Sequence, residues 1–336
     1  MMLNTLLITT VVIALSVTIT GCSQKVVIRA LEPAEIDRAA LTKKVSVAPF
    51  ENDRFGISNK IEANLAKQKI DDKEYFTVIS RKDFDKIIAE QKIQNSGLVD
   101  VATALDVGNL IGAQAIISGR VGHATSKDRY FYEERLRCLD KKCKESIKYR
   151  VSCTKRAVGL SAEIRMVDIS KGDIIYADTL NKTSEYKQCQ DSTDGLPTSE
   201  AASGLLANRI ANDFTYKLLP HYRYFEVVLL DDPDIEYSSH EDKLLESSLE
   251  YIKQNRLDKA EKLLVDLIDS TQQKSYVPFY NLGVIKEAQG AYGEAQKYYK
   301  MADDLVVEPV VEVSTAYVRI GDMIEKHKKA KEQLSK

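Results

Sequence analysis

Four cysteines in the middle of the chain are the residues whose type and spacing indicate the most specific chemistry. They are Cys138, Cys143, Cys153 and Cys189. Cysteine thiolates bind zinc or pair as disulfides, but these four include no C-x-x-C pair and no neighbouring His, as zinc sites usually do. An even number of cysteines in an exported chain is typical of disulfides. We therefore expect two disulfides and no metal site.

Turn signals in the sequence favour one of the three ways to pair four cysteines. Asp140-Lys141 lies midway between Cys138 and Cys143, so a short hairpin there would place these two opposite each other. Around Ser170-Lys171-Gly172-Asp173 the flanking residues alternate in strand fashion, which predicts a second hairpin. Folding about its centre brings Cys153 within one residue of register with Cys189, so a bulge or small slip would align them. The predicted disulfides are Cys138–Cys143 and Cys153–Cys189.

The fifth cysteine, Cys22, follows an uncharged and mostly apolar segment from Leu3 to Gly21. Small residues directly before a cysteine resemble the lipobox, the cleavage and lipidation signal of bacterial lipoproteins, and the apolar segment fits an export signal. No Lys or Arg precedes the segment, so an uncleaved anchor helix is the alternative. The resemblance implies a signal peptide over 1–21 and a lipid anchor on Cys22, with more than one acyl chain for stable binding. The residue after Cys22 is Ser23 and not Asp, which in the enterobacterial pattern implies that the lipoprotein is sorted to the outer membrane. We therefore expect it at the periplasmic face of that membrane.

Length and patterning predict two folded domains. The chain has 336 residues, 44% of them hydrophobic, and a net charge of −2, which gives no electrostatic reason to bind nucleic acid. Residues 22–41 are polar and read as a tether. Over 42–230, strands alternate with helices before hairpins follow, which predicts an α/β (α+β) sandwich with a mixed sheet. A charged break with a proline at 231–234 then precedes a helical domain over 240–334.

The first domain contains a series of short motifs in a recognisable order. They are Val45-x-Val47-x-Pro49-Phe50; Phe76-x-Val78-x-x-Arg81-x-x-Phe84-x-x-Ile87-Ile88-x-Glu90-Gln91; Gly97; Val107-Gly108-x-Leu110-x-Gly112-Ala113-x-x-Ile116-Ile117-x-Gly119-x-Val121; and Glu163-x-Arg165-x-Val167-Asp168-x-x-x-Gly172. This order resembles the CsgG-like lipoproteins, the family typified by the curli secretion channel. The resemblance covers about residues 43–220 and implies a protein of the bacterial envelope.

The resemblance also raises the possibility of a pore. In the curli channel two hairpins enter the outer membrane, and the matching segments here are 127–156 and about 181–199. The first holds 11 Lys and Arg against five acids, a net charge of 11 − 5 = +6. A charged side chain facing lipid costs up to about 2–4 kcal/mol. Non-pore relatives, such as lipoproteins that regulate cell-wall synthases or parts of flagellar basal bodies, therefore fit better.

Two interpretations of the basic segment 127–156 stay open. Its charge and its interleaved aromatic residues could dock an acidic partner, anionic lipid or the cell wall. The alternative is that the segment is a solvated sheet edge with no binding role, where charge discourages edge-to-edge pairing.

The second domain resembles tetratricopeptide repeats. Its signature comprises Phe279, Leu282-Gly283, Ala295, Tyr299 and Ala302, with the small Gly283 and Ala295 where two helices would touch. A weaker copy precedes it, since Ala260 lies 295 − 260 = 35 residues before Ala295, and residues 312–334 would form a charged capping helix. The resemblance implies a binding groove lined by Leu249, Ile252, Tyr280, Val284 and Glu287. A plain helical bundle is the alternative.

The sequence predicts a binding role and not an enzyme. It contains no G-x-S-x-G, H-E-x-x-H, Walker A or G-x-G-x-x-G motif, and its four His are scattered, so we expect no active site and no cofactor. We expect a periplasmic scaffold or regulator of envelope assembly that binds envelope protein partners, as a monomer or a homo-oligomer. The alternative is a subunit of a CsgG-type curli/amyloid secretion channel. A cell-wall enzyme would need a catalytic carboxylate or nucleophile in a cleft.

Overall fold

The computed structural model describes residues 24–79 and 101–335. These residues fall into two compact units, which we call the sheet unit (Ala30–Arg223 with Glu325–Lys336) and the helical unit (Met1–Arg29 with Tyr224–Ile324). The predicted signal peptide 1–21, Cys22 and the motif residues from Arg81 to Gly97 lie outside the described residues. Within 24–79 and 101–335, no helix combines the length and the apolar character needed to cross a bilayer.

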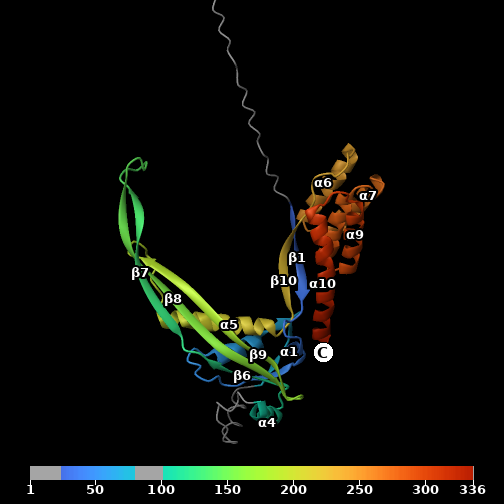
Figure 1. Ribbon diagram of the computed structural model, residues 1–336. Coiled ribbons are helices and arrows are strands. Elements are labelled where there is room, and N and C mark those ends of the chain that lie inside the picture. The colour runs from blue at the N-terminus through green and yellow to red at the C-terminus, as the bar shows by residue number, and fades with distance from the viewer. Residues whose placement is uncertain (1–23, 80–100, 336) are drawn as a thin grey trace, which may run out of the picture. The chain divides into compact units, whose positions relative to one another are not determined.

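One mixed sheet organises the sheet unit (Figure 1). Its strands are β2 (Lys44–Val47), β5 (Thr77–Val78), β6 (Ala115–Val121), β7 (Thr125–Cys138), β8 (Ser146–Asp168) and β9 (Asp173–Cys189). Their order is β5-β2-β6-β8-β7, and β9 pairs with the other edge of β8. Strand β2 is parallel to β5 and β6, whereas β8 is antiparallel to β6, β7 and β9. The mixed sheet confirms the predicted fold class. A separate small sheet pairs β3 (Lys69–Ile70) with β4 (Lys73–Glu74).

Helices cover both faces of the sheet because the central strand β6 is apolar on both sides. Ala115 and Ile117 belong to a large core that includes residues of α2 (Ile57–Lys67) and α5 (Ser199–Lys217). Ile116, which lies between them in the strand, belongs to a second core with residues of α4 (Val101–Ile111). Successive strand residues point to opposite faces. Helices α2 and α5 therefore pack on one face and α4 on the other, as a sandwich requires.

Residues 24–41 are folded, so the tether predicted over 22–41 is wrong. Strand β1 (Lys25–Glu32) pairs with β10 (His221–Val228), and the short helix α1 (Asp37–Leu41) follows. Ile28 and Ala39 are completely buried. The β-branched run Val26-Val27-Ile28 favours a strand, but its partner strand comes only after α5, and the local polarity of the segment gives no sign of it.

The boundary between the units also differs from the break predicted near 231–240. Strands β1 and β10 and helix α10 (Val311–Ser335) each contribute residues to both units. The last turns of α10 belong to the sheet unit. There the side chain of Gln333 accepts a hydrogen bond from the Ala34 backbone (2.8 Å) and donates one to Asp37 (2.7 Å), while the Lys43 ammonium donates to the Gln333 carbonyl (3.0 Å). The end of the chain therefore helps to hold the start of the sheet unit.

Two consecutive helix pairs form most of the helical unit. They are α6 (Ser239–Lys253) with α7 (Leu257–Ser270), and α8 (Tyr276–Ala288) with α9 (Tyr292–Leu305). Asn255 and Gly290, which lie between the helices of each pair, both have positive φ angles (57° and 76°). They are 290 − 255 = 35 residues apart, the same spacing as the buried Ala260 and Ala295. The two pairs thus turn at equivalent positions.

A close helix contact explains the glycine in α8. A Cβ atom on Gly283 would lie 2.6 Å from two ring atoms of Tyr299, which is completely buried in α9. The structure thus confirms that Gly283 is small because the helices touch there.

We predict that Gly283→Ala destabilises the helical unit by about 1–3 kcal/mol, since the added methyl group overpacks a closed contact. Gly321→Ala is the matched control, because a Cβ there meets nothing within 4 Å and the helix gains up to about 1 kcal/mol in propensity. Urea denaturation followed by circular dichroism measures both. Equal effects of the two substitutions would contradict the contact.

Candidate functional site

The β7–β8 hairpin extends beyond the rest of the sheet and is the first candidate site (Figure 1). Strand β9 ends at Cys189, opposite Cys153, so the first residues of β8, from Ser146 to Ser152, are paired along the strand ladder only with β7. An isolated two-stranded ribbon is only marginally stable in water. The two disulfides lie at the two ends of this unsupported stretch.

The structure contains the disulfides Cys153–Cys189 and Cys138–Cys143. Cys153 and Cys189 are directly paired across β8 and β9, with Cα atoms 4.0 Å apart. Next to the turn Asp168 is paired with Asp173, and a β-bulge between Met166 and Val167 shifts the register by one residue, which places Cys153 opposite Cys189. Cys138 and Cys143, with Cα atoms 4.8 Å apart, close the turn at the end of the hairpin. One bond therefore fixes the base of the ribbon and the other fixes its tip.

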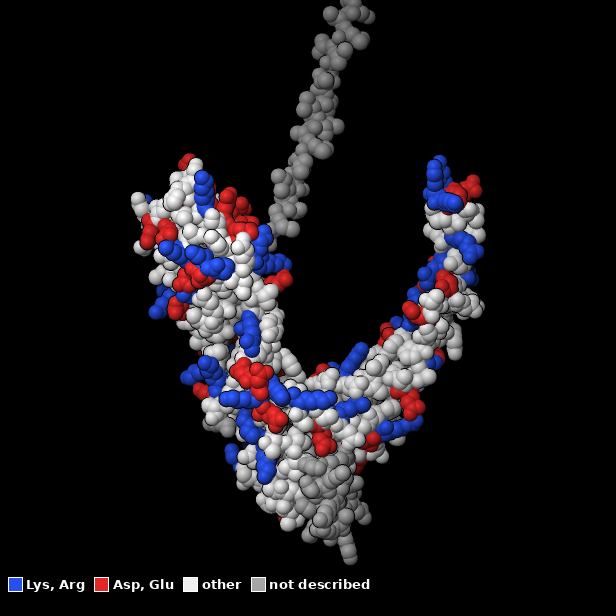
Figure 2. Space-filling view, turned by 180° about the vertical axis from the view of Figure 1, so that it is seen from behind, with Lys and Arg blue, Asp and Glu red and all other residues white. Residues whose placement is uncertain are grey.

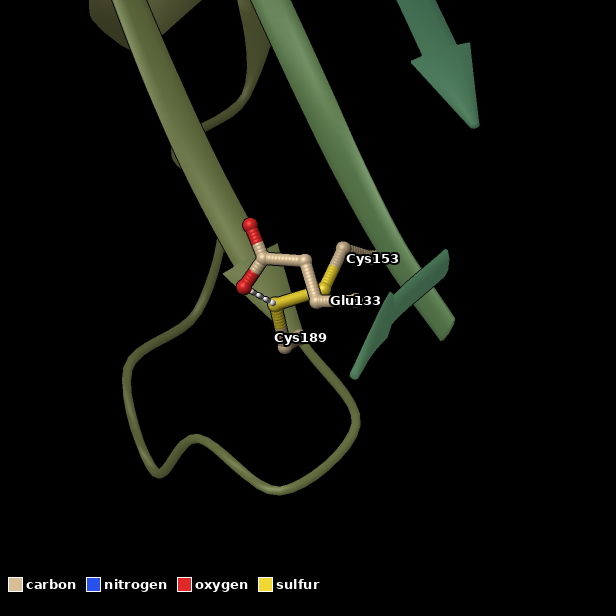
Figure 3. Close-up of side chains that lie close together, drawn as sticks. All are labelled: Glu133, Cys153 and Cys189. Atoms are coloured by element: carbon tan, nitrogen blue, oxygen red, sulfur yellow. Dashed lines mark hydrogen bonds between the residues drawn. A yellow bond between two sulfur atoms is a disulfide. The ribbon is translucent and has the colours of Figure 1, made fainter. Parts of the chain in front are cut away.

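Charged side chains lie beside the buried Cys153–Cys189 bond, and Figure 3 shows Glu133 next to it. The Glu133 carboxylate lies 4.0 Å from the Cys189 sulfur, and the Arg135 guanidinium lies 3.7 Å from the same atom. Glu133 also forms ion pairs with Arg135 (3.2 Å) and Lys187. Glu133, Cys153 and Cys189 are close enough to share a metal ion. Zinc, however, binds thiolates, and these sulfurs are bonded to each other, so the cluster is the environment of a disulfide.

A small apolar core supports the same end of β9. Val151 and the two cysteines are buried, and the side chains of Phe131 and Tyr149 pack against them. The Gln190 backbone N–H donates to the Ser152 carbonyl (3.0 Å), which continues the pairing past the end of β9. This core is the point at which the ribbon is attached to the sheet.

The charges of the basic segment 127–156 divide into two groups. Near the base they are paired: Arg156 with Asp128 (2.6 Å) and Lys155 with Glu185 (2.7 Å). The hydrogen bond from Arg156 lowers the pKa of the Asp128 carboxyl below its usual value. Beyond this region lies the ribbon tip, which we define as residues 134–150. Among the described residues, no carboxylate forms an ion pair with Arg137, Lys141, Lys142, Lys144, Lys148 or Arg150.

Lys and Arg side chains gather at the end of the ribbon, at the upper right of Figure 2. The acid at the turn, Asp140, is held by the backbone of the turn. It accepts backbone hydrogen bonds from Lys142 (2.8 Å) and Lys144 (3.1 Å), and these bonds, led by that from Lys144, lower its pKa. Among the described residues, its carboxylate forms no ion pair with the Lys and Arg side chains of the tip.

The second candidate site, the groove predicted in the helical unit, is not open. All five of its predicted residues are at most 9% exposed, so they cannot line a free surface. They are Leu249, Ile252, Tyr280, Val284 and Glu287.

The chain itself occupies part of this face of the helical unit. The Tyr280 hydroxyl donates to the Val228 carbonyl (2.8 Å), and the Asn281 amide both donates to the Leu230 carbonyl (2.7 Å) and accepts from the Leu230 N–H (2.9 Å). Glu287 accepts two hydrogen bonds from Arg319 of α10 (2.9 and 2.8 Å) and forms an internal ion pair with it. The repeat pattern could not show that the chain itself buries these positions.

Sequence reasoning missed an exposed apolar surface in the helical unit. Val307, Val311 and Val318, which we call the valine face, are 97%, 74% and 73% exposed. The seven-residue spacing of Val311 and Val318 was a visible signal, because residues seven apart lie on the same side of a helix.

We predict different effects for the loss of the two disulfides. Replacing Cys153 and Cys189 with Ala should lower the free energy of unfolding by about 4 kcal/mol, whereas the same change at Cys138 and Cys143 should cost about 2 kcal/mol, because the closed loops span 36 and 5 residues. Guanidinium denaturation of the variants and of the reduced wild-type protein measures this. A larger loss from the Cys138–Cys143 pair would contradict the role assigned to the ribbon base.

Sequence and structure were compared with those of known proteins. No curated protein matches the sequence. Among solved structures, lipoprotein GNA1162 from Neisseria meningitidis is 13% identical over 51% of this chain and 97% of that chain, with a TM-score of 0.27. The hypothetical protein CT253 from Chlamydia trachomatis is 11% identical over 51% of this chain and 92% of that chain, with a TM-score of 0.25. At these identities and scores, neither likeness bears on function.

Residues 39–209 match the family described as curli production assembly/transport component CsgG. The match runs from the start of the sheet into α5 and confirms the resemblance seen in the motifs between Val45 and Gly172. Because it covers just over half of the residues, the chain belongs to the CsgG family.

Proposed function

We propose that this protein is a lipoprotein, anchored through Cys22 at the periplasmic face of the outer membrane, that acts as a scaffold or regulator of envelope assembly. Its helical unit binds an envelope protein partner. The observation that carries this proposal is the valine face, because it is an apolar surface at the point where a stacked helical array would be expected to end.

The valine face lies where a polar cap was expected. Arrays of stacked helices need a terminal element with a polar outer side. The start of α10 instead exposes Val311 and Val318 to solvent, with Val307 just before the helix. Exposed apolar surface on a folded protein is typical of a protein-binding site. A partner that covers these valines would remove that surface from water.

The architecture of the helical unit supports a binding module of the tetratricopeptide type. The two helix pairs each contain a buried alanine and a turn residue with positive φ, at a spacing of 35 residues, close to the 34 of that repeat. Two pairs are few for an independent array, since each repeat buries its apolar side against a neighbour. This supports a partner that continues the stack.

Family membership and the N-terminal sequence support the location. The family is described by a role in the assembly and transport of curli, which are made at the envelope. Small residues before Cys22 fit lipidation, and two acyl chains hold a protein stably on a bilayer. Envelope assembly is therefore the process in which we place the binding activity.

The valine face is tested by crosslinking in cells. A photoreactive amino acid at Val318 should give a discrete, heavier adduct with one partner, and Val311→Glu combined with Val318→Glu should abolish co-purification of that partner, because two charges would be buried without counter-ions. The same photoreactive residue at Lys297, which is exposed on α9, is the control. Equal adducts at both positions would contradict a specific surface.

The solubility of the protein without its lipid anchor distinguishes a lipid-anchored scaffold from a channel subunit. Replacing residues 1–22 with a cleavable export signal should release the protein from the membrane fraction. A chain that begins at Ser23 should sediment as a monomer or small oligomer without detergent. Rings of many subunits that persist only in detergent would instead support the CsgG-type secretion channel. Analytical ultracentrifugation with and without detergent gives the answer.

A further inference from the structure

The ribbon tip, residues 134–150, combines a net positive charge with exposed apolar side chains. It holds seven Lys and Arg against three acids, a net charge of 7 − 3 = +4. Leu136, Leu139 and Ile147 are 66%, 58% and 46% exposed. Charge alone is common on a solvated sheet edge, but such an edge gains nothing from leucines in water. The combination calls for a partner that is both anionic and apolar.

Basic and apolar residues alternate on both faces of the tip. Leu136 is paired across the strands with Lys148, and Arg137 with Ile147. Directly paired residues of an antiparallel ribbon lie on the same face. Each face therefore presents a cation beside an apolar side chain. At the base of the tip, the Arg150 guanidinium lies 4.9 Å from the centre of the exposed ring of Tyr132, which repeats the arrangement.

The tip is held in one shape without a partner. The Cys138–Cys143 bond closes the turn, and Asp140 accepts backbone hydrogen bonds from three following residues. A preformed loop loses little conformational entropy on binding. Lys141, Lys142 and Lys144 are thus presented together at its end, with Leu139 beside them.

We propose that the ribbon tip docks to the surface of an anionic phospholipid bilayer. The lysines contact lipid phosphates, while the exposed side chains of Leu136, Leu139 and Ile147 contact the boundary between headgroups and acyl chains. A bilayer surface offers both chemistries within its interfacial layer. A soluble polyanion would use the lysines only. The alternation of charges on both faces keeps the strands out of the hydrocarbon centre, where charged residues are costly. This inference is independent of the protein partner proposed above.

Vesicle binding by a chain that begins at Ser23 tests the docking, because this chain retains every described residue and has no lipid of its own. It should co-sediment with phosphatidylcholine vesicles that contain phosphatidylglycerol, and not with pure phosphatidylcholine. Binding should weaken steeply in high salt. Lys141→Glu, Lys142→Glu and Lys144→Glu together should lower the affinity about a hundredfold, at roughly fivefold for each lysine.

Matched variants distinguish the tip from general surface charge. Lys67→Glu, Lys69→Glu and Lys73→Glu change three exposed lysines elsewhere in the sheet unit and should leave vesicle binding intact. Leu136→Ser with Leu139→Ser keeps all the charge and should still lower the affinity at least several-fold. Circular dichroism and a thiol count check that each variant is folded and has its disulfides.

Three results would overturn the proposal. The first is no binding to anionic vesicles by the wild-type chain. The second is an equal loss of vesicle affinity in the control lysine variant, which would mean that the net charge of the protein, and not the ribbon tip, determines binding. The third is binding to soluble polyphosphate as tight as to vesicles and unaffected by the leucine substitutions, which would assign the tip to a soluble acidic polymer.

Discussion

The register of β8 is the constraint on which the rest of the sheet unit depends. This strand of 23 residues pairs with β6 and β7 along one edge and with β9 along the other. Because side chains alternate between faces, a slip of one residue would exchange the core face for the solvent face. The same register places Ile164 and Met166 in the core and Cys153 opposite Cys189. Correct packing at one end of β8 therefore also aligns the disulfide near its other end.

Local sequence signals predicted those parts of the protein that depend on short-range pairing. Strand alternation on both sides of Lys171-Gly172 was enough to align Cys153 with Cys189 to within one residue, and Asp140 marked the turn between Cys138 and Cys143. The mixed sheet followed from the order of strands and helices. Segments whose partners are distant in sequence were mispredicted. Strand β1 was interpreted as a tether because its partner β10 is remote in the sequence. Gln333 was assigned to a helical domain, although it accepts a hydrogen bond from Ala34 of the sheet unit.

The helical unit shows why an amphipathic pattern does not identify a binding groove. A buried helix face has the same spacing whether it packs on a ligand or on the chain itself. Here Asn281 contacts both backbone groups of Leu230, which is the kind of contact that an extended peptide would receive. The burial of Glu287 depends on Arg319, since an unpaired carboxylate would be costly inside the protein. With this face satisfied internally, the predicted groove is closed, whereas the valine face is exposed.

If Cys22 is lipidated, as proposed above, the early start of β1 sets the distance between the folded protein and the membrane. Strand β1 begins at Lys25, only three residues after Cys22. A fully extended chain of that length spans about 10 Å, whereas a flexible tether of about twenty residues could span several times that distance. With Cys22 lipidated, as proposed, the N-terminal end of β1 has almost no slack and stays at the headgroup layer. A partner that binds near this end must itself reside at the membrane surface and cannot be captured from deep in the periplasm.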